Sequence, residues 1–243
     1  MSAAEADAAR GLFETLLVVD GRPVELDAHL RRLDDSCKAM LGLPLPREAR
    51  RLALQHAAGI GLGRLRITLL GEGKGTRVEA QASPVDPAIV FPTAGGGVEL
   101  RTLRLPGGLG SHKLVDRRSL ESVREPAVAL LLDEAGDVLE ASRANVFVVR
   151  GDEVITPPAD GRILAGIARE GVIAVARELG IRLTEAKLSV ADLLAANEVF
   201  LTGSVRGVQH AGSIDGAALQ PAGDISRRLA DGLRKRWGLD GAR

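Results

Sequence analysis

The chain has 243 residues, 45% of them hydrophobic and 26% charged, which is enough for one large globular domain or two smaller ones. Its 32 Lys and Arg residues balance its 32 Asp and Glu residues, so charge gives no reason to expect nucleic acid or an anionic membrane as a partner. The single cysteine, Cys37, excludes an internal disulfide framework and fits a reducing compartment. The sequence contains neither a signal peptide pattern nor an apolar run near the roughly 20 residues of a membrane span, so we expect a cytoplasmic protein.

The first part of the chain is predicted to alternate short strands and amphipathic helices. A strand over Leu12–Val19 ends at Asp20-Gly21, a strong hairpin signal, and residues 24–26 are the expected returning strand. Asp27 is the expected N-cap of a helix whose apolar residues recur at helical spacing. Further elements are expected at residues 47–58 (a helix) and at residues 65–70, 76–81 and 98–103 (strands).

The glycine-rich stretch Gly107–Gly110 is the best candidate for a linker between domains. We therefore expect a small α/β lobe over residues 1–106, a linker over 107–112 and a larger, cofactor-binding lobe over 113–243. The strands expected in that larger lobe are 127–132, 138–140, 146–149, 154–156 and 198–202, and the helices are 166–179 and 223–237. Clusters of strands separated by helices indicate an α+β fold in two lobes.

One lysine and one carboxylate stand in unusual local contexts. Lys113 ends the stretch Gly107-Gly-Leu-Gly-Ser-His-Lys113, where glycines let the backbone bend freely. Glu140 precedes a turn of small residues and the β-run 146–149, although glutamate is depleted in strands. A lysine that forms an imine and a carboxylate that holds a ring nitrogen are what pyridoxal phosphate chemistry requires. The pair therefore suggests a pyridoxal phosphate enzyme.

Two further segments are candidates for binding a phosphate. Residues 161–169 carry glycine-rich backbone into a helix N-terminus, where N–H groups and the helix dipole favour an anion. Residues 202–205 follow a buried strand and supply a hydroxyl and backbone amides. On local evidence alone, an ordinary helix start and a plain strand-end turn are the alternatives. The stretch 73–76 breaks the Walker order, and the four histidines lack metal-ligand spacing, so no metal site is expected.

Taken in order, these segments resemble the class IV pyridoxal phosphate enzymes, the D-amino-acid and branched-chain aminotransferase-like family of fold type IV. The resemblance runs from about Gly11 to Val208. The motifs that carry it are Phe13-Glu-Thr-Leu, His29-Leu-Arg-Arg32-Leu, Lys113 with Asp116-Arg117, Glu140 to Phe147, Thr156-Pro-Pro, Gly166-Ile-Ala-Arg169 and Phe200-Leu-Thr-Gly-Ser204.

The resemblance implies a role for each matching residue. Lys113 would form the imine with the cofactor and move the substrate proton, and Glu140 would keep the pyridine nitrogen protonated. Arg32 would hold the cofactor phosphate through a charge-assisted hydrogen bond. Further contacts to that phosphate would come from Ile167, Ala168, Ser204 and Val205. The family is typically homodimeric, so we expect a homodimer acting on a small-molecule amine, without nucleic acid or membrane.

The branch of the family is suggested by the residues after the lysine. The pattern Lys113-x-x-Asp116-Arg117, in a chain without tyrosine, is similar to the aminodeoxychorismate lyases, which convert 4-amino-4-deoxychorismate into 4-aminobenzoate and pyruvate for folate synthesis. Arg117 or Arg206 would bind the substrate carboxylate. One alternative is a class IV amino-acid transaminase. The other is a catalytically idle cofactor-binding or interaction paralogue, suggested by Ala168 where the family often has threonine.

Overall fold

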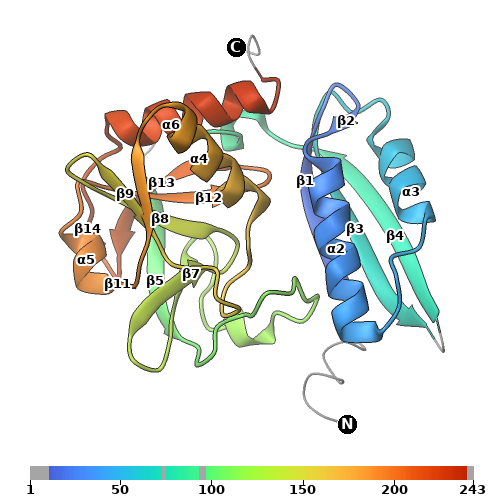
Figure 1. Ribbon diagram of the computed structural model, residues 1–243, viewed down its shortest axis with the longest axis horizontal. Coiled ribbons are helices and arrows are strands. Elements are labelled where there is room, and N and C mark those ends of the chain that lie inside the picture. The colour runs from blue at the N-terminus through green and yellow to red at the C-terminus, as the bar shows by residue number, and fades with distance from the viewer. Residues whose placement is uncertain (1–10, 73–74, 93–96, 240–243) are drawn as a thin grey trace. The chain divides into compact units, whose positions relative to one another are not determined.

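The computed structural model describes residues 11–72, 75–92 and 97–239 and divides the chain into two compact units (Figure 1). The smaller unit comprises residues 1–89 and 112–118, and the larger unit comprises residues 90–111 and 119–243. The sequence predicted instead a single boundary at 107–112. The difference arises because the strand at Val98–Arg104 pairs within the larger unit, whereas the backbone around Lys113 bonds to the first strand of the smaller unit.

The smaller unit is one antiparallel sheet with two helices. Its strands are β1 (Leu12–Val19), β2 (Arg22–Pro23), β3 (Leu62–Glu72) and β4 (Gly75–Pro84), in the order β2-β1-β3-β4, and its helices are α2 (Leu26–Leu41), α3 (Glu48–Ala57) and the short 3-10 turn η1 (Pro87–Ile89). Strand residues alternate between the two faces of a sheet. In β1, Leu12, Leu16 and Val18 belong to the same buried cluster as apolar residues of α2 and α3, which places Glu14 on that helix-covered face.

Two local predictions in this unit are wrong. The returning strand was expected at 24–26, but β2 ends at Pro23, because Glu25 takes a left-handed conformation and a helix begins at Leu26. Asp27 was expected to cap the helix, but α2 begins at Leu26, with Glu25 in a left-handed conformation (φ 54°) as its N-cap residue. Leu26 is buried in the core, so the helix starts two residues earlier than expected, and Asp27 pairs with Arg50 of α3.

The larger unit is built on a ten-stranded mixed sheet (Figure 1). Its strands are β5 (Val98–Arg104), β6 (Val128–Leu132), β7 (Asp137–Ala141), β8 (Asn145–Arg150), β9 (Glu153–Thr156), β10 (Arg182–Glu185), β11 (Leu188–Ser189), β12 (Glu198–Gly203), β13 (Gly207–Ile214) and β14 (Ala217–Ala218). Its helices are η2 (Arg118–Leu120), which begins at the junction of the two units, α4 (Ile167–Glu178), α5 (Val190–Leu194) and α6 (Asp224–Arg236). The order along the sheet is β10-β9-β8-β12-β13-β5-β6-β7-β11, and β14 pairs with β13.

The centre of this sheet is apolar on both faces. Val146, Phe147, Val148 and Val149 of β8 are all buried, which explains the continuous apolar run in the sequence. The rings of Phe147 and Phe200 stack with their centroids 5.0 Å apart, across the β8–β12 pairing. Helix α4 packs on β12 and on α6, and α6 packs on β13. Among the described residues, no helix is long and apolar enough to cross a membrane.

Most elements predicted from the sequence are present with ends shifted by a few residues. The hairpin expected around residues 71–75 joins β3 to β4, and residues 73–74 at its tip lie outside the described residues. Elements not expected from the sequence are β10, β11, α5, β13, β14 and the 3-10 turns η1 and η2. The short strands β11 and β14 are defined by their pairing partners, β7 and β13, rather than by a local pattern.

Candidate active site

Lys113 lies beside β1 in the smaller unit, and its backbone is fixed there. The Phe13 N–H donates to the Lys113 carbonyl oxygen at 2.9 Å, and the Val115 N–H donates to the Gly11 carbonyl oxygen at 3.0 Å. The Lys113 ammonium nitrogen lies 5.0 Å from the centroid of the Phe13 ring. The glycine-rich stretch therefore leads into an ordered position for this lysine.

Two arginines, like Lys113, lie close to the aromatic ring of Phe13. The guanidinium carbon of Arg66 lies 3.8 Å from the ring centroid, and that of Arg117 lies 5.5 Å from it. Burial lowers the pKa of Arg66, and the charge of Arg64 lowers this pKa further. A carboxylate bound here would be attracted by several cations at once. Arg117 was predicted from the sequence, whereas Arg66 was missed because alternating charges on a strand usually indicate a solvated face.

Arg32, the predicted phosphate ligand, is held by a buried carboxylate. Its Nε donates to Glu14 Oε1 at 2.8 Å, and its Nη2 donates to Glu14 Oε2 at 2.7 Å. The ring of His29 contacts the same carboxylate at 2.7 Å. Burial alone would raise the pKa of Glu14, but the bonds from His29 and Arg32 outweigh it and lower that pKa to about 2. Glu14 is therefore an anion that orients the guanidinium of Arg32.

Glu140, the predicted ligand of the ring nitrogen, is buried in the larger unit. Its side chain accepts from the Leu164 N–H at 3.3 and 3.4 Å and from Asn145 Nδ2 at 3.4 Å. Asn145 Nδ2 also donates to the Leu164 carbonyl oxygen at 2.9 Å. Asn145 and Leu164 therefore connect the predicted ring-binding carboxylate to the loop before α4, and neither was assigned a role from the sequence.

The N-terminus of α4 begins next to Asn145. A Cβ added to Gly166, the N-cap residue, would lie 2.1 Å from Asn145 Oδ1, so any larger residue there would displace the Asn145 side chain. No side chain caps this helix end. The backbone amides of Ile167 and Ala168, the predicted phosphate ligands, are in its first turn, where N–H groups point out of the helix. Ala168 itself is buried.

The predicted phosphate-binding segment at residues 202–205 lies next to the strand that carries Asn145. Thr202 of β12 pairs with Asn145 of β8, and a Cβ added to Gly203 would lie 3.5 Å from the Arg143 carbonyl oxygen. Ser204 and Val205 form the turn that follows β12, and both are partly buried. The larger unit thus brings together Glu140, the start of α4 and the turn after β12. Arg206 is exposed, and its charge helps Arg143 to lower the pKa of Glu125.

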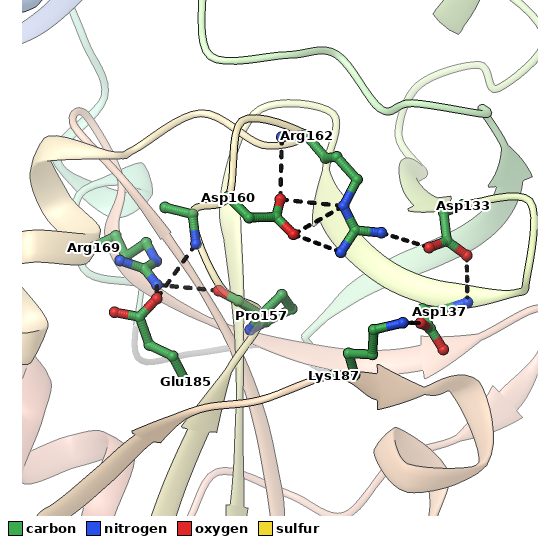
Figure 2. Close-up of polar contacts among 9 residues, drawn as sticks. Asp133, Asp137, Pro157, Asp160, Arg162, Arg169, Glu185 and Lys187 are labelled. Carbon is green, nitrogen blue, oxygen red and sulfur yellow. Dashed lines mark hydrogen bonds and ion pairs between the residues drawn. The ribbon is translucent and has the colours of Figure 1, made fainter.

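A buried arginine fixes the start of α4 to its surroundings (Figure 2). Arg169 is 1% exposed, donates to the Pro157 carbonyl oxygen at 3.1 Å and pairs with Glu185 at 2.7 Å. Glu185 is the last residue of β10. Arg169 was part of the family motif, and its contacts give it a structural role that the sequence did not indicate.

The sequence profile of amino-transferase class IV matches residues 11–94 and 116–214. The chain belongs to the class IV aminotransferase family. The match includes most of both units and contains Arg32, Glu140, Ile167 and Ser204, while Lys113 lies between its two segments.

Similar proteins within this family carry different activities in their names. A Methanocaldococcus jannaschii protein, provisionally named a branched-chain-amino-acid aminotransferase, is 29% identical over 94% of this chain and 88% of its own. A hypothetical aminotransferase from Mycobacterium tuberculosis, solved with pyridoxal phosphate, has a TM-score of 0.82 and 27% identity over 99% of this chain and 94% of that one. The 4-amino-4-deoxychorismate lyase of Pseudomonas aeruginosa has a TM-score of 0.78 and 26% identity over 97% of this chain and 94% of the lyase chain.

These findings confirm the predicted class IV fold, the enzyme class and, at the level of the family, the cofactor. An observation in the larger unit fits that cofactor. Thr202 Oγ1 is buried without a hydrogen-bond partner among the described residues, on the strand that pairs with Asn145 beside Gly166. Buried polar atoms are normally paired, so a ligand oxygen in this position would satisfy the hydroxyl. The start of α4 has no side-chain cap, so its backbone N–H groups could likewise donate to a phosphate.

Proposed function

We propose that this class IV enzyme is a pyridoxal-phosphate-dependent 4-amino-4-deoxychorismate lyase, which forms 4-aminobenzoate and pyruvate. The observation that carries the proposal is the group of three cations, Lys113, Arg66 and Arg117, that lie within 5.5 Å of the centroid of the Phe13 ring. The proposed substrate has two carboxylates, one for each arginine, and an amine that would react at the position of Lys113. Likeness to the Pseudomonas aeruginosa lyase supports this choice within the family.

The cofactor half of the site is proposed as follows. Bound pyridoxal phosphate supplies a ring that accepts the electron pair left behind when a proton leaves the amine-bearing carbon. Glu140 would hold a proton at the ring nitrogen, and Arg32 would bind the phosphate through hydrogen bonds that Glu14 orients. The groups proposed to complete the phosphate site are the backbone amides of Ile167 and Ala168, together with Ser204 and Val205.

On the substrate side, the Lys113 amine would take the proton from the amine-bearing ring carbon. The C–O bond to the enolpyruvyl group on the adjacent carbon then breaks, the ring becomes aromatic, and the released enolpyruvate takes up a proton to give pyruvate. No external oxidant is needed, because bond cleavage and aromatisation balance within the substrate. Arg66 and Arg117 would hold the carboxylates, and we favour them over the exposed Arg206.

Transamination of an amino acid is the second candidate. It is supported by the Methanocaldococcus jannaschii relative and the Mycobacterium tuberculosis structure, both named as aminotransferases. Glutamate, like the lyase substrate, carries two carboxylates, so the cations around Phe13 would also suit it. An assay must therefore separate the two reactions.

The assay follows two products with the same enzyme preparation. Incubation with 4-amino-4-deoxychorismate should give equal amounts of 4-aminobenzoate and pyruvate, and incubation with amino acids plus 2-oxoglutarate should give little glutamate. Glutamate formation without 4-aminobenzoate would overturn the lyase proposal in favour of transamination. Arg66→Met and Arg117→Met should each raise KM for the lyase substrate by about tenfold or more, since charge-assisted hydrogen bonds are lost. Arg64→Met, an exposed arginine on the same strand, should leave KM unchanged.

The cofactor assignment has its own test in the visible spectrum. The wild-type protein with pyridoxal phosphate should absorb in the visible range, and Lys113→Ala should lose that band together with activity. Lys38→Ala removes an exposed lysine that pairs with Asp34 and should change neither. Equal absence of the band in wild type and Lys113→Ala would instead favour an idle paralogue.

We also propose a homodimer in the cytoplasm, on the resemblance and on the single, buried cysteine Cys37. Light scattering coupled to size-exclusion chromatography should give twice the 25.5 kDa mass of one chain. A mass of one chain at micromolar concentration would contradict the dimer.

A further inference from the structure

The loop between β9 and α4 is attached to one hairpin at two points. The hairpin is formed by β6 and β7, with Asp133 directly after β6 and Glu140 within β7. Leu164 of the loop donates its N–H to Glu140, and Arg162, two residues earlier, donates from Nη1 to Asp133 Oδ2 at 2.6 Å. Between them, Ile163 is buried in the same cluster as Leu131 of β6.

The Arg162 side chain forms ion pairs with two carboxylates, those of Asp160 and Asp133 (Figure 2). Its Nε and Nη2 donate to the carboxylate of Asp160 at 3.0 and 2.7 Å, while its Nη1 reaches Asp133. Asp133 is 7% exposed and accepts the Asp137 N–H at 2.9 Å, which fixes the turn between the two strands. A planar guanidinium can hold one carboxylate through two of its nitrogens and a second carboxylate through the third, whereas a lysine ammonium offers a single nitrogen.

The backbone of Arg162 makes a further connection. Its carbonyl oxygen accepts the Gly110 N–H at 3.2 Å. A Cβ added to Gly108, which has φ +70°, would lie 2.1 Å from the same oxygen, so glycine is required for this approach. Gly108 and Gly110 belong to the segment that leads to Lys113. Arg162 therefore joins three segments: the β6–β7 turn, the loop before α4 and the glycine stretch before the lysine.

We propose that Arg162 is a positioning residue for the cofactor site. Its ion pairs with Asp133 and Asp160 fix the loop between β9 and α4. In this position the Leu164 N–H donates to the Glu140 carboxylate, and Gly166 is the N-cap of α4. The proposal rests on the role of Glu140 and the α4 N-terminus in holding pyridoxal phosphate, as stated under the proposed function. Without the ion pairs of Arg162, the hydrogen bonds from Leu164 and Asn145 to Glu140, which are already 3.3 Å or longer, would be lost first.

The test measures cofactor binding rather than turnover. Arg162→Met in the full-length protein should raise the dissociation constant of pyridoxal phosphate at least tenfold. It should also shift the visible absorbance maximum of the bound cofactor in the same direction as Glu140→Gln does. Arg162→Lys should give an intermediate dissociation constant, since lysine keeps the positive charge but lacks the several nitrogens with which the guanidinium bonds two carboxylates. If Arg162→Met does not fold, Asp133→Asn removes the buried charge while its amide oxygen can still accept the Asp137 N–H, and the same shift is expected.

A matched control separates this role from general stability. Arg182→Met removes an exposed arginine of β10 whose Nη2 donates to both carboxylate oxygens of Asp152, and it should leave both the dissociation constant and the absorbance maximum unchanged. An Arg162→Met protein that melts earlier but binds cofactor with unaltered affinity and spectrum would overturn the positioning role. Absence of the visible band in wild type would count instead against the proposed function.

Discussion

Glu14 accepts hydrogen bonds from both Nε and Nη2 of Arg32, at 2.8 and 2.7 Å, with the Glu14 side chain only 2% exposed. A buried ion pair contributes little net stability over an apolar pair, but the loss of one partner leaves a buried charge uncompensated. Glu14→Ala should therefore lower the free energy of unfolding by about 3–5 kcal/mol, measured by urea titration. Asp27→Ala, which removes an exposed pair with Arg50, should leave it nearly unchanged. Equal effects of the two variants would contradict this account.

Acid should destabilise the protein through the same carboxylate. The pKa of Glu14 is about 2 in the folded protein against an ordinary 4.5, so the unfolded chain binds its proton at higher pH. The stabilisation is complete above pH 4.5 and is lost as the pH falls towards 2, by about 3 kcal/mol in all. Urea midpoints measured between pH 6 and 3 should fall more steeply for wild type than for Glu14→Gln. Parallel curves would show that other groups dominate acid unfolding.

His29 should add a separate pH dependence nearer neutrality. Burial lowers its pKa, although the hydrogen bond to Glu14 opposes the shift. The unfolded chain therefore takes up the proton first, and stability declines as the pH falls below about 6.5. In His29→Gln the slope of unfolding free energy between pH 7.5 and 5.5 should flatten. His56→Gln, on α3 and exposed, is the control that should keep the wild-type slope.

Gly166→Ala should damage the proposed phosphate site. The added methyl group would lie 2.1 Å from Asn145 Oδ1, so the Asn145 side chain must move away from Glu140 and Leu164. We expect the dissociation constant of pyridoxal phosphate to rise at least tenfold, about 1.4 kcal/mol, by spectral titration. Gly61→Ala is the matched control, since a Cβ there meets nothing within 4 Å. Unaltered cofactor affinity in Gly166→Ala would count against a role for this helix end.

Glu198 should stabilise the last helix from a distance in sequence. Its buried carboxylate accepts the Ile225 and Ser226 N–H groups at 3.2 and 3.0 Å, and α6 has no side-chain cap of its own. Glu198→Ala should lower the unfolding free energy by about 1–2 kcal/mol, the usual cost of losing an N-cap. Glu178→Ala, an exposed glutamate of α4, should have little effect by the same denaturation assay. A smaller loss for Glu198→Ala than for Glu178→Ala would exclude the capping role.

Local patterns in the sequence identified the strands and helices whose signals are periodic. The apolar run of β8 and the amphipathic pattern of α4 predicted both elements within about two residues. The start of α2 was misplaced, because burial of Leu26 and the conformation of Glu25 decide it rather than the capping tendency of Asp27. The domain boundary was placed differently for a similar reason, since pairing of β5 with β6 and β13 is a long-range contact.

The sequence by itself determined the family, the candidate lysine and the candidate carboxylate, because those depend on residue types in a fixed order. Only the tertiary structure showed which residues contact them. Glu14 accepts hydrogen bonds from Arg32, Arg66 lies over the Phe13 ring near which Lys113 also lies, and Asn145 and Leu164 donate to Glu140. Hydrogen bonds and ion pairs of this kind join residues far apart in the chain. Their distances depend on how strands and loops pack, and no local pattern in the sequence contains that information.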